Sequence, residues 1–173
     1  MRKKVLVAQS GGPTVAINAS LAGVIAGVAQ SGDYEVFGAA NGIKGVLDEN
    51  FINLSEFRED VKNGKESVSE IKISQPDGTF DTWSPKSMID RLAITPSMYL
   101  GSCRYKLPSV EEGAEVYEKI FSILDKNDIG MFFYIGGNDS MDTTAKLSAY
   151  AKKTGIDVKF IGIPKTIDND LMY

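Results

Sequence analysis

The chain has 173 residues, with 19 lysines and arginines, 23 aspartates and glutamates, one cysteine and no histidine. These counts exclude a histidine-based catalytic triad, a histidine-ligated zinc site and an intrachain disulfide. A formal charge of −4 argues against a general nucleic-acid or anionic-membrane surface, because both need a basic footprint. The single thiol, Cys103, fits a reducing compartment, so we expect a cytoplasmic protein, and no apolar run approaches the length of a membrane span.

The first elements along the chain predict a βαβ unit. Residues 4–9 form a short β-branched run that stops at the SGGPT motif of residues 10–14, and residues 15–30 place apolar and small side chains at helical spacing. A second apolar run covers residues 34–40. This order predicts two neighbouring parallel strands joined by a right-handed crossover.

The middle of the chain is less regular. Asn41, Gly42 and Gly45 predict a turn, residues 51–54 a short strand and residues 56–62 a short helix. These short elements do not by themselves define a fold.

An exposed hairpin is predicted next, because residues 68–81 alternate in polarity and contain the turn motif PDG at 76–78. We interpret the segment of about 67–83 as an insertion. A helix is expected over 84–93, and Pro96 prevents it from continuing far.

From residue 109 the pattern becomes regular. Ser109 followed by Glu112 predicts a capping box at the start of a helix. Apolar strands are expected over 130–135 and 158–163, with a helix ending at Thr154 between them. Continuous apolar strands that alternate with helices predict an α/β, doubly wound, mostly parallel sheet.

Three of the predicted strands end in polar motifs. These are SGGPT at 10–14, GGNDS at 136–140 and PKTIDND at 164–170. Ligands of such sheets bind beyond the carboxyl ends of the strands. If the three strands are neighbours, the three motifs line one crevice.

The first motif leaves the backbone N–H groups of Gly11 and Gly12 uncovered at a helix N-terminus, which favours a phosphate. For this motif taken alone, a tight turn that requires glycine is the better explanation. It lacks the GxGxxG spacing and the lysine of a P-loop, so both of those nucleotide-binding assignments are disfavoured.

The other two motifs carry side-chain chemistry. Asn138, Asp139 and Ser140 stand at a helix start, where one cap would explain only one of them, so we favour a phosphate or Mg²⁺ role. Lys165 and Asp168 follow the next strand, and a carboxylate beside a lysine and a phosphate site suits a general base. A turn with hydrogen bonds from its own Asp and Asn side chains explains the DND tripeptide equally well.

Taken together, these segments resemble the phosphofructokinase family, specifically its pyrophosphate-dependent branch. The matching segments, in chain order, are KKVLVAQSGGPTVAINA at 3–19, NGIKGVLDENFINL at 41–54, LGSCR at 100–104, IGGNDS at 135–140 and GIPKTIDND at 162–170. The resemblance implies that residues 1–173 are the N-terminal, phosphoryl-donor-binding domain of a two-subdomain enzyme. The sugar-phosphate half would then lie outside this sequence.

The resemblance also implies an activity, the Mg²⁺-dependent transfer of a phosphoryl group from pyrophosphate to fructose 6-phosphate, giving fructose 1,6-bisphosphate in glycolysis or gluconeogenesis. By the same resemblance Asp168 is the general base. Thr166 and Ile167 bind the sugar substrate with it, and Asp170 supports the loop. The complete enzyme is expected to be a homo-oligomer, either a dimer or a tetramer.

Donor choice follows from two departures from the ATP-using pattern, which has glycines where this chain has Asp139 and Lys165. The Asp139 carboxylate would occupy the space and repeat the charge of a nucleotide α-phosphate, and Lys165 would supply a cation to the transferred group. Asn138 occupies the position of the metal-binding aspartate. The implied phosphoryl-donor residues are Gly11, Gly12, Arg104, Gly137 and Ser140.

Two alternatives remain open. One is an ATP-dependent 6-phosphofructokinase, since related kinases carry a similar glycine-rich turn. The other is a non-catalytic regulatory paralogue that binds sugar phosphate or pyrophosphate, for which the neutral Asn138 is a weak argument and against which the intact TID motif speaks.

Overall fold

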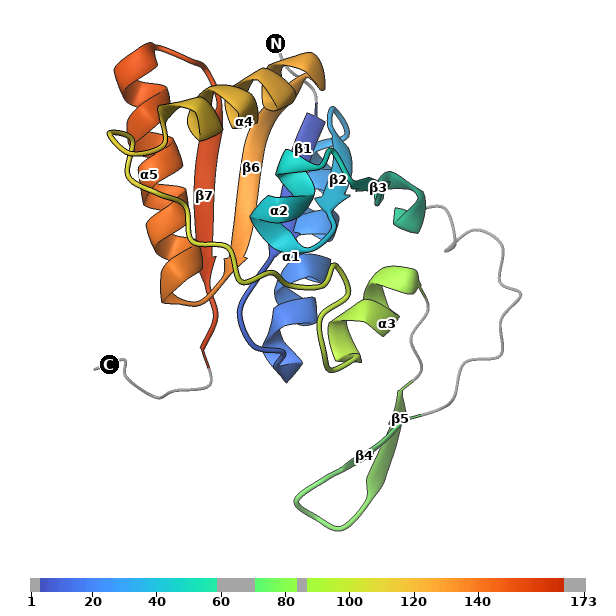
Figure 1. The fold of residues 1–173 in the computed structure, drawn as a ribbon. Coiled ribbons are helices and arrows are strands. Elements are labelled where there is room, and N and C mark those ends of the chain that lie inside the picture. Colours follow the sequence, from blue (N-terminus) through green and yellow to red (C-terminus); the bar gives the residue numbers. More distant parts are fainter. Residues whose placement is uncertain (1–3, 59–70, 84–86, 167–173) are drawn as a thin grey trace.

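A five-stranded sheet forms the centre of the structure, a computed structural model that describes residues 4–58, 71–83 and 87–166 (Figure 1). Four strands run parallel to their neighbours and the fifth, at one edge, runs antiparallel. In chain order they are β1 (Lys4–Gln9), β2 (Glu35–Ala39), β3 (Phe51–Asn53), β6 (Ile129–Gly136) and β7 (Lys159–Pro164), and their order across the sheet is β3-β2-β1-β6-β7.

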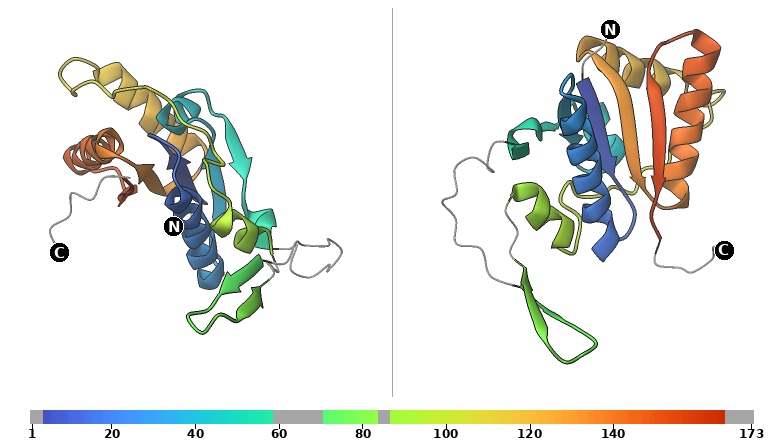
Figure 2. Two further views of the ribbon diagram at one scale, coloured as in Figure 1. Left: turned by 90° about the horizontal axis from the view of Figure 1, so that it is seen from below. Right: turned by 180° about the vertical axis from the view of Figure 1, so that it is seen from behind.

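Helices cover both faces of this sheet (Figure 2). One face carries α1 (Val15–Ser31) and α3 (Met88–Ile94), and the other carries α2 (Gly42–Leu47), α4 (Ala114–Lys126) and α5 (Asn138–Thr154). The interior of the central β1 is therefore apolar, and its residues 5–8 are completely buried. The predicted doubly wound, mostly parallel α/β sheet is confirmed. In the described parts of the chain, no helix is long and apolar enough to cross a membrane.

The N-terminal βαβ unit agrees closely with its prediction. β1 and β2 pair in parallel, with Val5 opposite Val36, and α1 connects them. The helix ends where Gly32 adopts the left-handed conformation, with φ 73°, and donates its N–H to the Ala29 carbonyl. Local sequence pattern and tertiary packing agree here.

The predicted capping box at Ser109 is wrong. The Ser109 hydroxyl donates to the Glu112 carboxylate at 3.0 Å, and the Ser109 carbonyl accepts the N–H groups of Glu112 and Gly113. These bonds close a turn, and α4 begins only at Ala114, with Gly113 as its N-cap. The Tyr117 hydroxyl then donates to the Pro108 carbonyl at 2.7 Å, which holds the turn against the helix.

The turn predicted around Asn41 and Gly45 is instead a short helix, α2. Asn41 is its N-cap in the left-handed conformation, with φ 61°. Gly45 does not break the helix but lets it approach β2, because a Cβ at this position would overlap the backbone of Ala40. Gly45, which the sequence suggested as a turn residue, is thus required for the close packing of α2 against the end of β2.

The predicted hairpin is confirmed as β4 (Ile71–Ser74) paired antiparallel with β5 (Phe80–Trp83), and it projects away from the main sheet (Figure 1). Its turn is closed by Asp77, whose carboxylate accepts the N–H and the hydroxyl of Thr79 at 2.9 and 2.6 Å. Whether this segment is an insertion stays a prediction.

The helices predicted on either side of the hairpin are only partly described. The short helix expected at 56–62 is a 3-10 turn, η1 (Ser55–Arg58), as far as the structure describes it. The helix expected from residue 84 is α3, which begins at Met88 because the Ser87 hydroxyl accepts the Asp90 N–H as an N-cap.

Candidate active site

The three polar motifs lie side by side at the carboxyl ends of their strands, because β1, β6 and β7 are adjacent and parallel. The ladder continues just past the strand ends. The Ser10 N–H donates to the Ile135 carbonyl at 2.9 Å and the Lys165 N–H donates to the Gly136 carbonyl at 2.8 Å. The three strands are therefore neighbours, as the prediction requires, and the described start of the third motif contacts the first; that all three motifs line one crevice stays a prediction, because residues 167–170 lie outside the described residues.

A cleft of about 930 Å³ lies beyond these strand ends. Its walls come from the first glycine turn, from the start of α5 and from residues 102–106, a segment distant in sequence from both. Seven of the predicted site residues line it, namely Gly11, Gly12, Arg104, Gly137, Asn138, Asp139 and Ser140.

The first glycine turn needs glycine at one position for conformational reasons. Gly11 has φ 86°, in the left-handed region that side chains disfavour. A Cβ added there would lie 3.5 Å from the backbone nitrogen of Gly137 and 3.6 Å from Nζ of Lys165. All three motifs thus come within contact distance around Gly11.

Lys165 connects the third motif to the first. Its side chain is 8% exposed, and its Nζ donates to the Gly12 carbonyl at 2.6 Å. A buried ammonium group needs such a partner. The structure therefore holds this cation against the glycine turn.

The rest of the third motif lies almost wholly beyond the described part of the chain. Thr166 is its last described residue and is exposed. Ile167, Asp168 and Asp170 lie outside the described residues, so the predicted general base and its neighbours stay predictions.

The second motif forms the start of α5. Gly137 is the N-cap, with an extended backbone, and no side chain caps the helix. Asn138 and Asp139 are exposed in the first turn, where the positive end of the helix favours a carboxylate. The simple capping role considered for these residues is thus absent.

Ser140 lies in the cleft wall and packs against Gly136. Ser140 is 3% exposed, and a Cβ on Gly136 would overlap its hydroxyl and lie 2.7 Å from the Ser10 carbonyl oxygen. The sequence interpretation did not include Gly136 among the site residues. The adjacent glycines of GGNDS were the available indication, and only the packing separates their roles.

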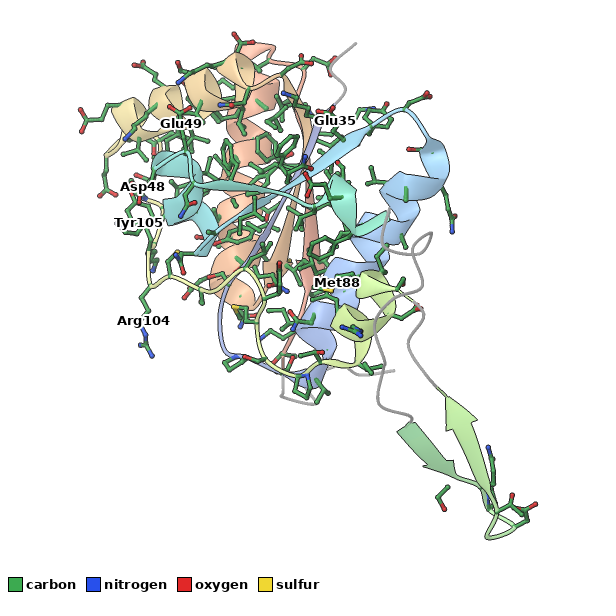
Figure 3. All side chains as sticks on the ribbon, turned by 90° about the vertical axis from the view of Figure 1, so that its right-hand side faces the viewer. Glu35, Asp48, Glu49, Met88, Arg104 and Tyr105 are labelled. Carbon is green, nitrogen blue, oxygen red and sulfur yellow. The ribbon has the colours of Figure 1, made fainter. Side chains whose placement is uncertain are left out.

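Arg104 belongs to a loop that is hydrogen-bonded to the first motif. The Ser102 hydroxyl donates to the Gly11 carbonyl at 3.0 Å, and the Ser10 hydroxyl donates to the Cys103 carbonyl at 3.3 Å. The Arg104 side chain is exposed and extends from the loop away from the body of the domain (Figure 3). It lines both the main cleft and a neighbouring cavity of about 340 Å³.

Tyr134 contributes a phenol to the cleft that the sequence interpretation missed, because it lies inside the apolar run of β6. Its side chain is buried and its hydroxyl accepts the Ile43 N–H at 3.3 Å. Burial raises the pKa of the Tyr134 phenol, while hydrogen bonds with Ser10 and Ser140 oppose that rise. At neutral pH it is an uncharged hydroxyl between the first two motifs.

Oxygen ligands for a cation are present at the start of α5. Asn138 and Asp139 suit Mg²⁺, which prefers oxygen and is commonly bound by one or two carboxylates together with substrate phosphates. Among the described residues there is no group of three or more acidic, histidine or cysteine side chains that could hold a metal by themselves. Any such ion would therefore need a phosphate ligand or a residue outside that set.

Comparison with known proteins gives a consistent family. The model of the phosphofructokinase family matches residues 4–173. The pyrophosphate--fructose 6-phosphate 1-phosphotransferase of Xanthomonas campestris is 43% identical over 166 residues, covering 96% of this chain and 33% of that protein. The ATP-dependent 6-phosphofructokinase of Aliivibrio salmonicida is 32% identical over 171 residues, covering 99% of this chain and 41% of that protein.

Solved structures give the same result. The pyrophosphate-dependent phosphofructokinase from Nitrosospira multiformis superposes with a TM-score of 0.72 at 38% identity, covering 99% of this chain and 35% of that one. The chain thus spans about a third of the length of the pyrophosphate-dependent relatives it matches.

Proposed function

This chain belongs to the phosphofructokinase family, and we propose that it forms the donor-binding part of an enzyme that phosphorylates fructose 6-phosphate with pyrophosphate. The observation that carries the proposal is the meeting of the three motifs, with Lys165 bonded to Gly12 and Asp139 in the wall of the same cleft. The names of the Xanthomonas campestris relative at 43% identity and of the Nitrosospira multiformis structure at 38% identity support this donor.

The cleft is suited to hold a phosphate by positioning and charge. The glycine turn lies at the N-terminus of α1, whose partial positive charge attracts anions, and α1 has no acidic residue in its first turn. Lys165 adds a cation beside this turn, and the Arg104 guanidinium at the cleft wall can bind phosphate oxygens in pairs. Phosphoryl transfer needs little beyond such placement of charge.

The acceptor side of the reaction is assigned to the end of the third motif. Asp168 would accept the proton of the sugar hydroxyl, with Thr166 and Ile167 beside the sugar and Asp170 supporting the loop. The oxygen atoms of Asn138 and Asp139 would hold Mg²⁺, whose contribution is to neutralise charge on the phosphates. The complete enzyme would be a cytoplasmic homo-oligomer.

Donor selection is assigned to Asp139 and Lys165. The exposed Asp139 carboxylate puts a negative charge in the cleft wall, where it would repel the additional phosphate of a nucleotide. The similarity to an ATP-dependent relative at 32% identity supports the second candidate, an ATP-dependent 6-phosphofructokinase. The two candidates differ in the donor they accept, so one assay separates them.

The test is to express the complete polypeptide that contains this chain and to measure formation of fructose 1,6-bisphosphate with pyrophosphate or ATP at equal Mg²⁺. We expect turnover with pyrophosphate, and a preference for ATP would overturn the donor assignment. Turnover with neither, together with retained pyrophosphate binding, would favour a regulatory paralogue.

Matched variants sharpen this assay. Asp139→Asn removes the charge inside the cleft. Asp157→Asn removes the same charge from an exposed site before the start of β7, at the end of the strand remote from the cleft. Only the first should improve the relative use of ATP. If both variants leave donor preference unchanged, Asp139 does not select the donor.

A further inference from the structure

Two buried amide side chains lie directly behind the first glycine turn. Gln9, the last residue of β1, is 0% exposed, and Asn18 in the second turn of α1 is 2% exposed. Gln9 Nε2 donates to the Ile17 carbonyl at 3.0 Å and to Asn18 Oδ1 at 3.1 Å. The two amides thus form one buried unit between the strand and the helix.

This amide pair also holds a segment remote in sequence. Gln9 Oε1 accepts the Leu100 N–H at 2.8 Å, and Asn18 Oδ1 accepts the Tyr99 N–H at 2.9 Å. Asn18 Nδ2 donates to the Thr95 carbonyl at 2.9 Å. Three backbone groups between residues 95 and 100 are therefore fixed by two side chains.

Leu100 is held from its other side as well. Its carbonyl accepts the Asn41 N–H at 2.6 Å, and its buried side chain packs so closely on Gly38 that a Cβ there would clash. Gly101 follows with φ 72°, and the chain then enters the cleft wall at Ser102. Leu100 is thus the last anchored residue before the segment that carries Arg104.

The surrounding core gives no reason for polar side chains at these positions. The cluster around them is apolar and includes Ile17, Leu21, Leu92 and Leu100. A buried polar network is costly unless every member is bonded, but when satisfied it specifies a single arrangement of the segments it joins. Here the joined segments are the two sides of the cleft.

We propose that Gln9 and Asn18 are positioning residues that fix the Arg104 segment against the glycine turn of the donor site. They act through the anchored backbone of residues 99–100, and the bonds from Ser10 and Ser102 complete the link across the cleft. The consequence for donor affinity rests on the proposed function, whereas the consequence for loop geometry does not.

The first test uses Cys103, the single thiol of the chain, as a reporter inside the positioned segment. Gln9→Leu removes the bond to the Leu100 N–H. Asn18→Ala removes the bonds to the Tyr99 N–H and the Thr95 carbonyl, but it leaves Leu100 bonded to Gln9 and adds no buried charge. Asn127→Ala is the matched control, because it removes an amide bonded to the Ile123 carbonyl at the C-terminal end of α4.

We expect the reaction of Cys103 with a thiol reagent in the folded 173-residue chain to accelerate about tenfold in Gln9→Leu and less in Asn18→Ala, which keeps Leu100 anchored. Asn127→Ala should leave the rate unchanged, because the bonds of Asn127 to the Ile123 carbonyl and the Glu49 carboxylate lie away from the segment that carries Cys103. Equal rates in all four proteins, with the wild type included, would overturn the proposal. If Gln9→Leu does not fold, the comparison of Asn18→Ala with Asn127→Ala decides the question.

The second test measures, by calorimetry in the presence of Mg²⁺, the binding of pyrophosphate to the complete polypeptide that contains this chain. Gln9→Leu should weaken binding about tenfold, and the effect should disappear in the Arg104→Ala background, because the amides act through that segment. An equal effect in both backgrounds would show a general structural role and overturn the proposal. If the wild type itself does not bind pyrophosphate, the donor assignment fails, while the Cys103 reaction still tests the positioning.

Discussion

The turns after β1 and β6 both place glycines at the edge of the cleft, but they use glycine for different reasons. Gly11 has a left-handed backbone, with φ 86°, and the space around its Cβ position is open to 3.5 Å. Gly136 lies within β6 and has no room for a Cβ beside Ser140 and Ser10. The first turn needs glycine for its left-handed backbone, and the second needs glycine because no side chain fits, although both contain two adjacent glycines.

The helices that follow the two turns differ in charge. α1 has no acidic residue in its first turn, whereas α5 has Asp139 there. The positive end of α1 is therefore left for an external anion, while that of α5 already faces a carboxylate. Two turns of similar composition thus offer opposite electrostatic environments to a ligand in the cleft.

The largest expected effect on stability comes from filling the crowded turn. Gly136→Ala would force its Cβ against Ser140 and the Ser10 carbonyl, and should lower the free energy of unfolding by about 3 kcal/mol. Gly27→Ala is the control, because Gly27 lies in α1 with open space around it, and it should not destabilise. Urea unfolding of both variants measures the difference, and similar values would contradict the packing argument.

A smaller effect is expected from the strained turn. Gly11→Ala should cost about 1–2 kcal/mol, because an L-residue is unfavourable in the left-handed region. Gly11→Asn should cost less, since asparagine tolerates this conformation better. Thermal unfolding of the two variants distinguishes conformational strain, which predicts this order, from a steric clash, which predicts the reverse.

Tyr134 lies between the two turns, and its removal should have a smaller effect that depends on pH. Its raised pKa means that the folded state keeps the phenol protonated where the unfolded chain, near pH 10, has lost the proton. The stabilisation is complete below that unfolded pKa and is lost as pH rises toward the folded pKa.

Tyr134→Phe tests this dependence. It should cost about 1 kcal/mol at neutral pH through loss of the bond from the Ile43 N–H, and should then lose stability less steeply above pH 10. Tyr117→Phe is a positive control away from the cleft, since burial also raises the Tyr117 pKa and its removal should likewise flatten the loss of stability above pH 10. Parallel curves for wild type and Tyr134→Phe would contradict the assignment.

The smallest effect on stability is expected at Gly12. Its Cβ position is open and its φ is not in the left-handed region, so Gly12→Ala should change the free energy of unfolding by less than about 0.5 kcal/mol. If the glycine turn binds the donor, the same variant should nevertheless weaken pyrophosphate binding. Chemical unfolding and calorimetry on one sample separate the two, and a large loss of stability would show that the turn is constrained at both glycines.

Much of the architecture was predictable because local signals were unambiguous. The run at residues 4–9, the helical spacing over 15–30 and the apolar stretch before Gly136 are each clear local patterns, and the structure agrees at all three. Prediction failed where one pattern has two physical meanings. Ser109 and Glu112 could cap a helix or close a turn, and Gly45 could end an element or permit close packing.

The same division applies to the site. The sequence by itself determined that three strands end in polar motifs, because strand, glycine turn and helix are local properties of the chain. Only the tertiary structure decided that these strands are neighbours, that residues 102–106 join them and that Tyr134, Gln9 and Asn18 lie behind them. These features depend on hydrogen bonds between residues about ninety positions apart, such as Gln9 and Leu100, and no local pattern encodes which distant backbone group a buried side chain will meet.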